Sequence, residues 1–323
     1  MVELECCCFK LCMRGVKLIM NVLEVRNVYK KLGKREIIKG ISFSVKEGEI
    51  FGFLGPNGAG KTTTIRMLVG LIAANKGSIS IAGYDIEKQR EKALMEVGAV
   101  VENPEMYIYL SGRENLMQIA RIRKIPKQTV QEVIELVDLK DRIDDKVRKY
   151  SLGMKQRLGL AAALMAKPKL LILDEPTNGL DPTGILDFRE IVKKAAKEHN
   201  TGVFVSSHML SEVQQLCDTV AFINNGEIQA IESITGGMVK NDTETLVLVT
   251  REPKNALDIL AKMEIIRKVS QDANTFYIVA SQDTSPEIVS KLVESGIDIK
   301  EIYKEHKELE ERYMELVEGG RRA

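Results

Sequence analysis

The apolar and polar positions of the chain alternate in two ways from Val22 onward. Short runs rich in β-branched residues predict strands, and longer amphipathic segments between them predict helices, an order that builds a sheet flanked by helices. Residues 111–166 differ, because their pattern is almost wholly helical, and we expect them to form a helical insertion within an α/β core. The predicted strands lie at 22–28, 40–45, 49–54, 78–82, 97–101, 169–174, 202–206, 218–223 and 227–231.

A second, smaller unit follows this core. The segment 232–244 is polar and contains adjacent glycines, so we expect a linker there. Residues 245–323 predict an α+β accessory domain with the ferredoxin-like order βαββαβ. Within it, 306–317 predicts a charged amphipathic helix, whose single apolar face serves internal packing or contact with another chain. The predicted strands of this unit are 245–250, 265–270, 275–280 and 297–303, and its helices lie near 254–263 and 286–294.

The N-terminal segment lies outside both patterns. We expect residues 1–20 to lie ahead of the folded domain at 21–231. Within them, residues 1–19 are expected to be an upstream extension with Met20 as the natural start, because strand-like patterning begins only after it. Since only Cys217 belongs to the patterned chain, no disulfide framework is predicted, and we expect a reducing, cytoplasmic setting. The other cysteines are closely spaced and have no histidine nearby, which is poor spacing for a metal site. They are Cys6, Cys7, Cys8 and Cys12.

Composition narrows the class of protein. With 323 residues, the chain is long enough for two domains of roughly 150 residues each. Its 47 Lys and Arg against 46 Asp and Glu give a net charge of +1, so we expect no global positive field and no nucleic-acid partner. A membrane-spanning helix needs roughly 18 successive apolar residues, and no stretch of the sequence approaches that length. We therefore expect a soluble chain.

The strongest candidate chemistry is a glycine-rich loop between the predicted strand 49–54 and a predicted helix at 63–71. Its glycines permit conformations and close approaches that a Cβ would block, so successive N–H groups can surround phosphate oxygens at the positive end of the helix. Lys61 would reach the outer phosphates, and Thr62 would offer a hydroxyl to Mg²⁺. The loop consists of Gly55, Pro56, Asn57, Gly58, Ala59, Gly60, Lys61, Thr62 and Thr63.

A pair of acids ends another buried strand. The apolar run Leu170–Leu173 leads into Asp174 and Glu175, at the sheet edge where parallel α/β folds bind ligands. We expect Asp174 to hold Mg²⁺, directly or through water, and Glu175 to polarise the water that attacks a γ-phosphate. An apolar run ending in two acids is more often an ordinary strand end, so the phosphate loop is what favours the catalytic interpretation.

Several separated elements then occur in one order along the chain. They are the loop 55–63, the segment Tyr150–Arg157, the run Leu170–Glu175, the turn Gly179–Asp181, and His208. Together they resemble the ATP-binding subunit of an ABC transporter. The resemblance covers about residues 21–231, and implies a P-loop ATPase domain there with a helical subdomain at about 84–167. Within the ABC-2 class, the bacitracin-exporter-like group shares the sequence motif Tyr-Ser-x-Gly-Met-Lys-Gln-Arg-Leu.

The resemblance implies roles that the pattern alone leaves open. Ser151 and Gly153 would present a hydroxyl and a backbone N–H, at a helix N-terminus, to the γ-phosphate bound by a second copy of the chain. Each site would then need two chains, whereas a simple helix N-cap is the alternative for Ser151. Asp181 would couple the two sites across the dimer, cap a helix, or do both. His208 would sense the γ-phosphate and help to hold the attacking water; its alternative is a plain surface histidine.

Two positions depart from the family pattern. Glu102 stands where the family has a glutamine that contacts Mg²⁺ and the membrane partner, and its negative charge would change the local field. The aromatic residue that stacks on adenine normally precedes Gly33, where this chain has Leu32. Tyr29 is the candidate replacement, and apolar contact with adenine is the alternative. In addition, Leu152 replaces the first glycine of the usual Ser-Gly-Gly.

The resemblance implies an ATPase that binds ATP and Mg²⁺ and closes as a homodimer around two nucleotides. Closure would drive export, by analogy of a drug or antibiotic peptide, through a separate permease at the inner face of the membrane. Two alternatives stay open, a soluble ABC ATPase that acts on ribosomes or DNA and a regulatory module that binds nucleotide without turnover. The single cassette and the lack of sustained heptads speak against the first. The paired acids speak against the second.

Overall fold

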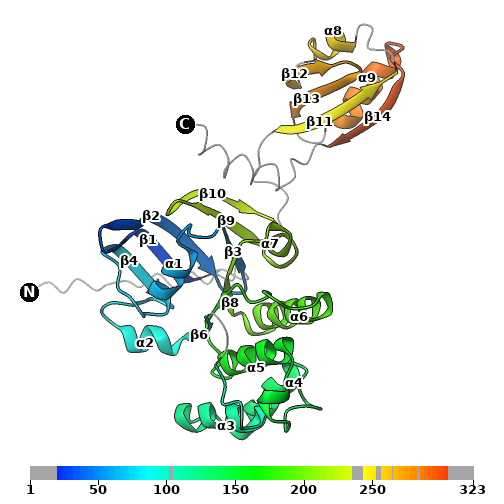
Figure 1. Ribbon diagram of the computed structural model, residues 1–323. Helices are drawn as coiled ribbons and strands as arrows, with labels where there is room; N and C mark the ends of the chain where they lie inside the picture. Colours follow the sequence, from blue (N-terminus) through cyan, green and yellow to red (C-terminus); the bar gives the residue numbers. More distant parts are fainter. Residues whose placement is uncertain are drawn as a thin grey trace, which may run out of the picture.

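The computed structural model contains three sheets, of four, six and four strands (Figure 1). They confirm the predicted fold class, an α/β core followed by a small α+β unit. Of the predicted segments, residues 1–19, residues 235–242 of the linker and the helix at 306–317 lie outside the described residues. The structure describes residues 20–101, 105–234, 243–251, 256–263, 265–281 and 284–304.

The six-stranded sheet is the centre of the core. Its order is β10-β9-β3-β8-β7-β6, and neighbouring strands are parallel except for the antiparallel pair of β9 and β10. Both faces are covered, so every residue of β3 and β7 is buried, which explains their uninterrupted apolar runs. The strands are β3 Ile50–Leu54, β6 Val97–Val100, β7 Leu170–Asp174, β8 Gly202–Ser207, β9 Thr219–Asn224 and β10 Glu227–Ser233.

A four-stranded antiparallel sheet of order β2-β1-β4-β5 packs on one face of the central sheet. Phe43 joins the two layers, since its ring stacks on Phe51 of β3 and Phe204 of β8, with centroids 5.3 and 5.6 Å away. The shortest strand of this sheet was not predicted, because two residues show no periodicity. The strands are β1 Asn21–Leu32, β2 Arg35–Lys46, β4 Lys76–Ile81 and β5 Tyr84–Asp85.

The helical insertion lies between β6 and β7 and is less helical than predicted. Leu139, Ile143 and Val147 are buried at helical spacing, yet 137–146 forms turns, with Asp138 in a left-handed conformation. The spacing of these three residues arises because all of them are buried in the same core, and it does not indicate a helix here. The insertion contains α3 Gly112–Arg123, α4 Lys127–Leu136, the 3-10 turn η1 Val147–Lys149 and α5 Leu152–Leu164. The other helices of the core are α1 Lys61–Leu68, α2 Arg90–Met95, α6 Pro182–His199 and α7 Leu210–Leu216.

The C-terminal unit has the predicted ferredoxin-like order. Its antiparallel sheet runs β12-β13-β11-β14, and it has an apolar core of its own, in which Leu248, Phe276 and Leu292 are fully buried. Figure 1 shows this sheet at the top of the view, apart from the other two sheets. Its elements are β11 Thr243–Thr250, α8 Ala256–Leu260, β12 Ile266–Asp272, β13 Thr275–Ser281, α9 Ser285–Glu294 and β14 Ile299–Lys304.

Candidate nucleotide-binding site

The phosphate loop connects β3 to the N-terminus of α1, as predicted. Gly60 is the N-cap of α1 with φ 113°, and Gly58 has φ 80°, both in the region that favours glycine. A Cβ at Gly55 would lie 2.2 Å from the carbonyl oxygen of Ile223, whereas a Cβ at Gly58 would meet nothing within 4 Å. The loop is therefore packed tightly at Gly55 and open at Gly58.

Lys61 turns back over this loop. Its side chain is buried, and Nζ donates to the carbonyl oxygens of Gly55, at 2.8 Å, and Pro56, at 3.3 Å. The same Nζ lies 3.3 Å from Glu175 Oε1. The ammonium group thus joins the phosphate loop to the acid pair at the end of β7, two segments that lie far apart in the sequence. Thr62, the next residue, lies half-buried in the first turn of α1.

The two acids, Asp174 and Glu175, lie in different environments. Asp174 is 7% exposed, and its Oδ1 accepts a hydrogen bond from Ser206 Oγ of β8 at 2.6 Å. The backbone N–H of Glu175 also donates to Ser206, at 3.2 Å to its carbonyl oxygen. Glu175 has φ 46°, a left-handed conformation directly after the end of the strand at Asp174.

Glu175 is the centre of the candidate site. Besides Lys61, its carboxylate binds His208 Nδ1 at 2.8 Å and accepts from Asn178 Nδ2 at 2.6 Å. Burial acts to raise the pKa of Glu175, but the hydrogen bond from Asn178 and the charges of Lys61 and His208 outweigh it. The pKa of Glu175 is therefore lowered, and the group is ionised at neutral pH. Asn178 was not predicted; its place in a turn three residues after the acid was the available signal.

The segment at the start of α5 forms a helix N-terminus, as predicted. Ser151 is the N-cap, and its Oγ accepts from the backbone N–H of Met154 at 3.2 Å. A Cβ on Gly153 would have no neighbour closer than 3.8 Å, so packing within the chain does not require glycine there. Leu152, which departs from the family pattern, is 40% exposed, and its side chain lies beside Gly179.

Asp181 caps the next helix. Its Oδ1 accepts from Gly184 N at 3.1 Å, and Pro182 occupies the first turn of α6. The capping alternative is therefore confirmed, and coupling between sites stays a prediction for this residue. Within the part of the chain that the structure describes, no hydrogen bond or ion pair joins Ser151 or Asp181 to the phosphate loop.

The comparisons with known proteins agree with one another. The ABC transporter family matches residues 38–178. The ABC transporter ATP-binding protein YhcH of Bacillus subtilis is 46% identical over 92% of this chain and 96% of its own length. The bacitracin transport ATP-binding protein BcrA of Bacillus licheniformis is 39% identical over 93% of this chain and 98% of its own. The chain belongs to the ATP-binding proteins of ABC transporters.

This family assignment settles the enzymatic class. An ABC transporter ATP-binding subunit binds ATP and hydrolyses it, so the chain is an ATPase. Among solved structures, cbiO1 of Clostridium perfringens, part of the ABC transporter complex cbiONQ, superimposes with a TM-score of 0.63 at 26% identity, over 67% of this chain and 89% of that one. The transporter names of these relatives favour a transporter subunit over a ribosome- or DNA-associated ATPase. None of the helices that the structure describes has the length and apolar character of a membrane-spanning segment.

Of the two positions that depart from the ABC pattern, the structure describes one, the adenine-stacking position, and does not describe the other, Glu102. Tyr29 is 36% exposed, and its ring covers Gly40 of β2, where a Cβ would lie 2.6 Å from Tyr29 Oη. Packing of the β1–β2 hairpin is thus one role of this tyrosine, and stacking on adenine stays a prediction. Leu32 is 48% exposed near the hairpin turn. Glu102 lies outside the described residues.

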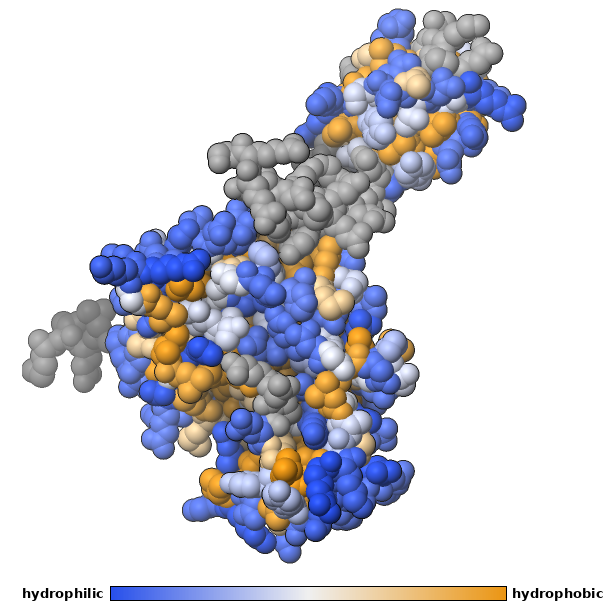
Figure 2. Space-filling view, in the orientation of Figure 1, coloured by the Kyte–Doolittle hydropathy of each residue, from blue (hydrophilic) through white to orange (hydrophobic). Residues whose placement is uncertain are grey.

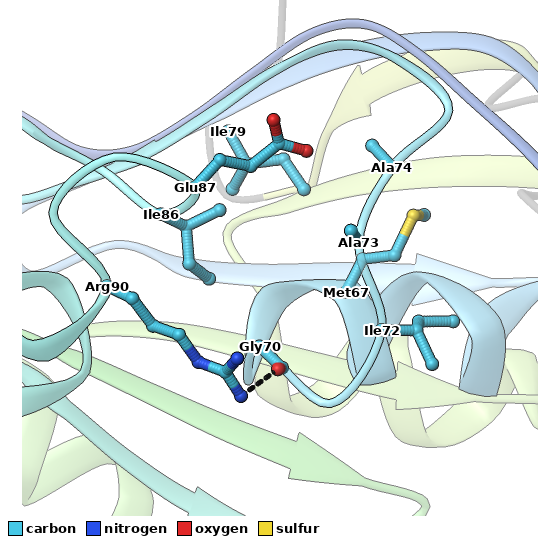
Figure 3. Close-up of a pocket in the computed structure, with 9 residues that line it drawn as sticks. All are labelled: Met67, Gly70, Ile72, Ala73, Ala74, Ile79, Ile86, Glu87 and Arg90. Carbon is cyan, nitrogen blue, oxygen red and sulfur yellow. Dashed lines mark hydrogen bonds between the residues drawn. The ribbon is translucent and has the colours of Figure 1, made fainter.

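The ABC ATPase core also has a concave surface that the sequence did not predict. A cavity of about 360 Å³ lies between the C-terminal end of α1, β4 and α2, at the opposite end of α1 from the phosphate loop (Figure 3). Its wall is apolar at Met67, Ile79 and Ile86, and Arg90 closes one side by donating to the carbonyl oxygen of Gly70. Figure 2 shows apolar side chains gathered over the same elements.

Proposed function

We propose that two copies of this chain close around two molecules of ATP with Mg²⁺ and thereby drive export through a separate permease at the cytoplasmic face of the membrane. One observation carries the proposal: an ionised Glu175 lies against Lys61 of the phosphate loop and against His208. These are the groups that hydrolysis of a terminal phosphate needs, a cation for the phosphate and a carboxylate for the attacking water.

The phosphate loop would bind the nucleotide. Backbone N–H groups at the start of α1 and the ammonium group of Lys61 supply positive charge at one place. In this structure Lys61 is held by two carbonyl oxygens and a carboxylate. The γ-phosphate is the stronger acceptor, and we expect it to replace them, so that ATP binding releases Glu175 from its ion pair.

The donor groups beside the loop fit Mg²⁺. The cation prefers a few hard oxygen ligands together with phosphates and water, and Thr62 and Asp174 offer a hydroxyl and a carboxylate. Among the described residues, no cluster of three or more His, Cys, Asp or Glu side chains could hold a metal ion. We assign Thr62, Asp174 and Glu102 to Mg²⁺. When bound, Mg²⁺ would neutralise charge that develops on the phosphates.

Glu175 would activate the attacking water. Its lowered pKa keeps the carboxylate able to accept a proton at neutral pH, and His208 and Asn178 fix its orientation. The oxygen of the water bonds to the γ-phosphorus while the bond from that phosphorus to the bridging oxygen breaks. The released proton passes toward Glu175, and ADP and phosphate are the products.

A second chain would complete each site. Ser151 and Gly153 lie at an accessible helix N-terminus, which is suited to binding an anion. Packing within the chain does not require a glycine at position 153. We infer that this helix N-terminus faces the γ-phosphate bound by the partner. We also infer that Asp181 lies at the dimer contact and couples the two sites. The γ-phosphate would then hold the closed dimer only until it is hydrolysed.

The names of the relatives support a proposal for the transported compound. One is named for bacitracin transport and another, from Streptococcus pyogenes, for lantibiotic transport, so we infer export of a peptide antibiotic or a similar compound. We place the permease contact on the apolar surface around the cavity at the end of α1, where Leu71 is 66% exposed.

The test is the variant Glu175→Gln, measured in parallel with wild type. We expect it to bind ATP with unchanged affinity, to form a stable dimer with Mg²⁺ and ATP in light scattering, and to release no phosphate. Hydrolysis at the wild-type rate by this variant would overturn the assignment of Glu175. Wild-type turnover by a chain that stays monomeric throughout would overturn the shared site.

A further inference from the structure

A buried carboxylate lies behind the candidate site. Glu212, in the first turn of α7, is only 8% exposed. Its Oε1 accepts a hydrogen bond from Thr177 Oγ1, and its Oε2 accepts from Ser207 Oγ at 3.0 Å. Each carboxylate oxygen is therefore matched by one hydroxyl donor. Placing a carboxylate inside a protein is costly unless its oxygens are bonded in this way, so the pairing needs an explanation.

The two donors belong to segments that carry site residues. Thr177 lies two residues after Glu175, and its carbonyl oxygen accepts from Leu180 N at 3.1 Å, which shapes the turn leading to Asp181. Ser207 ends β8 directly before His208, and its carbonyl oxygen accepts from Gly55 N of the phosphate loop at 3.3 Å. Glu212 is thus bonded to the turn after the acid pair and to the strand end that supports both His208 and the loop.

We propose that Glu212 is a positioning residue for hydrolysis, which holds the Glu175 turn and the His208 strand end in one fixed arrangement. The proposal rests on the proposed function, since it assumes that Glu175 activates water and that His208 orients it. In this proposal Glu212 acts through Thr177 and Ser207, which it contacts, and has no direct role toward the nucleotide or the water. Its effect is on the 2.8 Å contact between His208 and Glu175, whose two partners come from the two segments that Glu212 connects.

Little space is left around the Glu212 carboxylate. A cavity of about 10 Å³ lies beside Glu212, and its lining includes Thr177, Ser207, Val213, Leu216 and the charged side chain of Arg189. That volume holds about one water, so solvent can replace the carboxylate only in part. Removing either hydroxyl would leave a carboxylate oxygen buried without its donor, which favours rearrangement of the attached segment.

Two variants test the proposal without a large change of volume. Thr177→Val removes one donor, and Glu212→Gln removes the charge and one acceptor. For both we expect kcat to fall by about ten- to a hundredfold, the loss that a misplaced catalytic group produces, with KM for ATP within about twofold of wild type. In Glu212→Ala, adding Thr177→Val should cost nothing more, because the interaction is already gone. Glu190→Gln, an exposed carboxylate on α6, is the matched control and should turn over like wild type.

The readouts separate positioning from folding. A thermal midpoint near that of wild type together with low kcat supports positioning. The proposal is overturned if Thr177→Val and Glu212→Gln keep wild-type kcat, if the loss of Thr177→Val adds to that of Glu212→Ala in the double variant, or if the losses vanish at temperatures far below each unfolding midpoint. Glu175→Gln in the same assay tests the proposed function separately. If it is inactive while Thr177→Val is fully active, only the role of Glu212 fails; if it is fully active, the proposed function fails.

Discussion

His208 Nδ1 lies 2.8 Å from Glu175 Oε2, although the two residues are 33 positions apart in the sequence. The contact forms because β7 and β8 are adjacent and parallel, so residues just beyond their C-terminal ends share one edge of the sheet. Asn178 binds the same carboxylate oxygen at 2.6 Å. The geometry gives Glu175 a fixed orientation before any nucleotide arrives.

The first prediction concerns pH. Burial opposes ionisation of Glu175, but its partners lower its pKa below the ordinary 4.5. A lowered folded-state pKa stabilises the fold above the unfolded-state value, and this stabilisation is lost as pH falls through the folded-state value. We expect Glu175→Gln to reduce the free energy of unfolding by about 1 kcal/mol at neutral pH, and the difference from wild type to shrink below the ordinary carboxylate pKa. Urea unfolding at a series of pH values measures it. A difference that grows on acidification would contradict the expected sign.

The second prediction concerns His208. Its contact orients Glu175, so His208→Ala should lower kcat by roughly ten- to a hundredfold and leave the Kd for ATP within about twofold. Phosphate release and equilibrium binding of a fluorescent ATP analogue measure the two quantities. His199→Ala removes an exposed imidazole at the end of α6 and is the matched control. Equal rates for the two variants would show that the 2.8 Å contact has no part in turnover.

The third prediction contrasts two glycines of the phosphate loop. A Cβ at Gly55 would lie 2.2 Å from a backbone oxygen, which cannot move cheaply, so Gly55→Ala should cost about 3 kcal/mol of stability. Gly58 has open space, and Gly58→Ala should cost only the strain of φ 80°, about 1 kcal/mol. Denaturant unfolding without nucleotide measures both. Equal losses would show that the packing against Ile223 is unimportant.

The sequence predicted those parts of the site that lie in one continuous segment. The loop 55–63, the acid pair and the helix start at Ser151 have residue types that report their local structure directly. The ferredoxin-like order was also predictable, because each of its strands and helices has its own period. These signals need no knowledge of what the segment packs against.

The parts that were missed depend on contacts between segments. Asn178 and Glu212 become site residues only because the sheet brings 174–178 beside 206–212. The cavity near Arg90 is made by three separate segments. The turns at 137–146 were mistaken for helix because burial on one side gave them helical spacing. In each case the feature depends on contacts between segments that are distant in the sequence, so no local sequence pattern could predict it.

The last prediction separates two roles of Ser151. As the N-cap of α5, it accepts from Met154 N, and Ser151→Ala should lower stability by about 1 kcal/mol. Aspartate caps a helix as well as serine does, so Ser151→Asp should keep the thermal midpoint of wild type. Its negative charge would face the partner's γ-phosphate, however, and repulsion should prevent the dimer that Mg²⁺ and ATP induce.

The dimer is best measured in the Glu175→Gln background, where hydrolysis does not reopen it. Light scattering with Mg²⁺ and ATP should show a dimer for Glu175→Gln and a monomer for Glu175→Gln with Ser151→Asp. ATP should still bind to the second variant, because its own phosphate loop is unchanged. A stable dimer of the double variant would place Ser151 away from the partner's nucleotide and leave it the role of a cap alone.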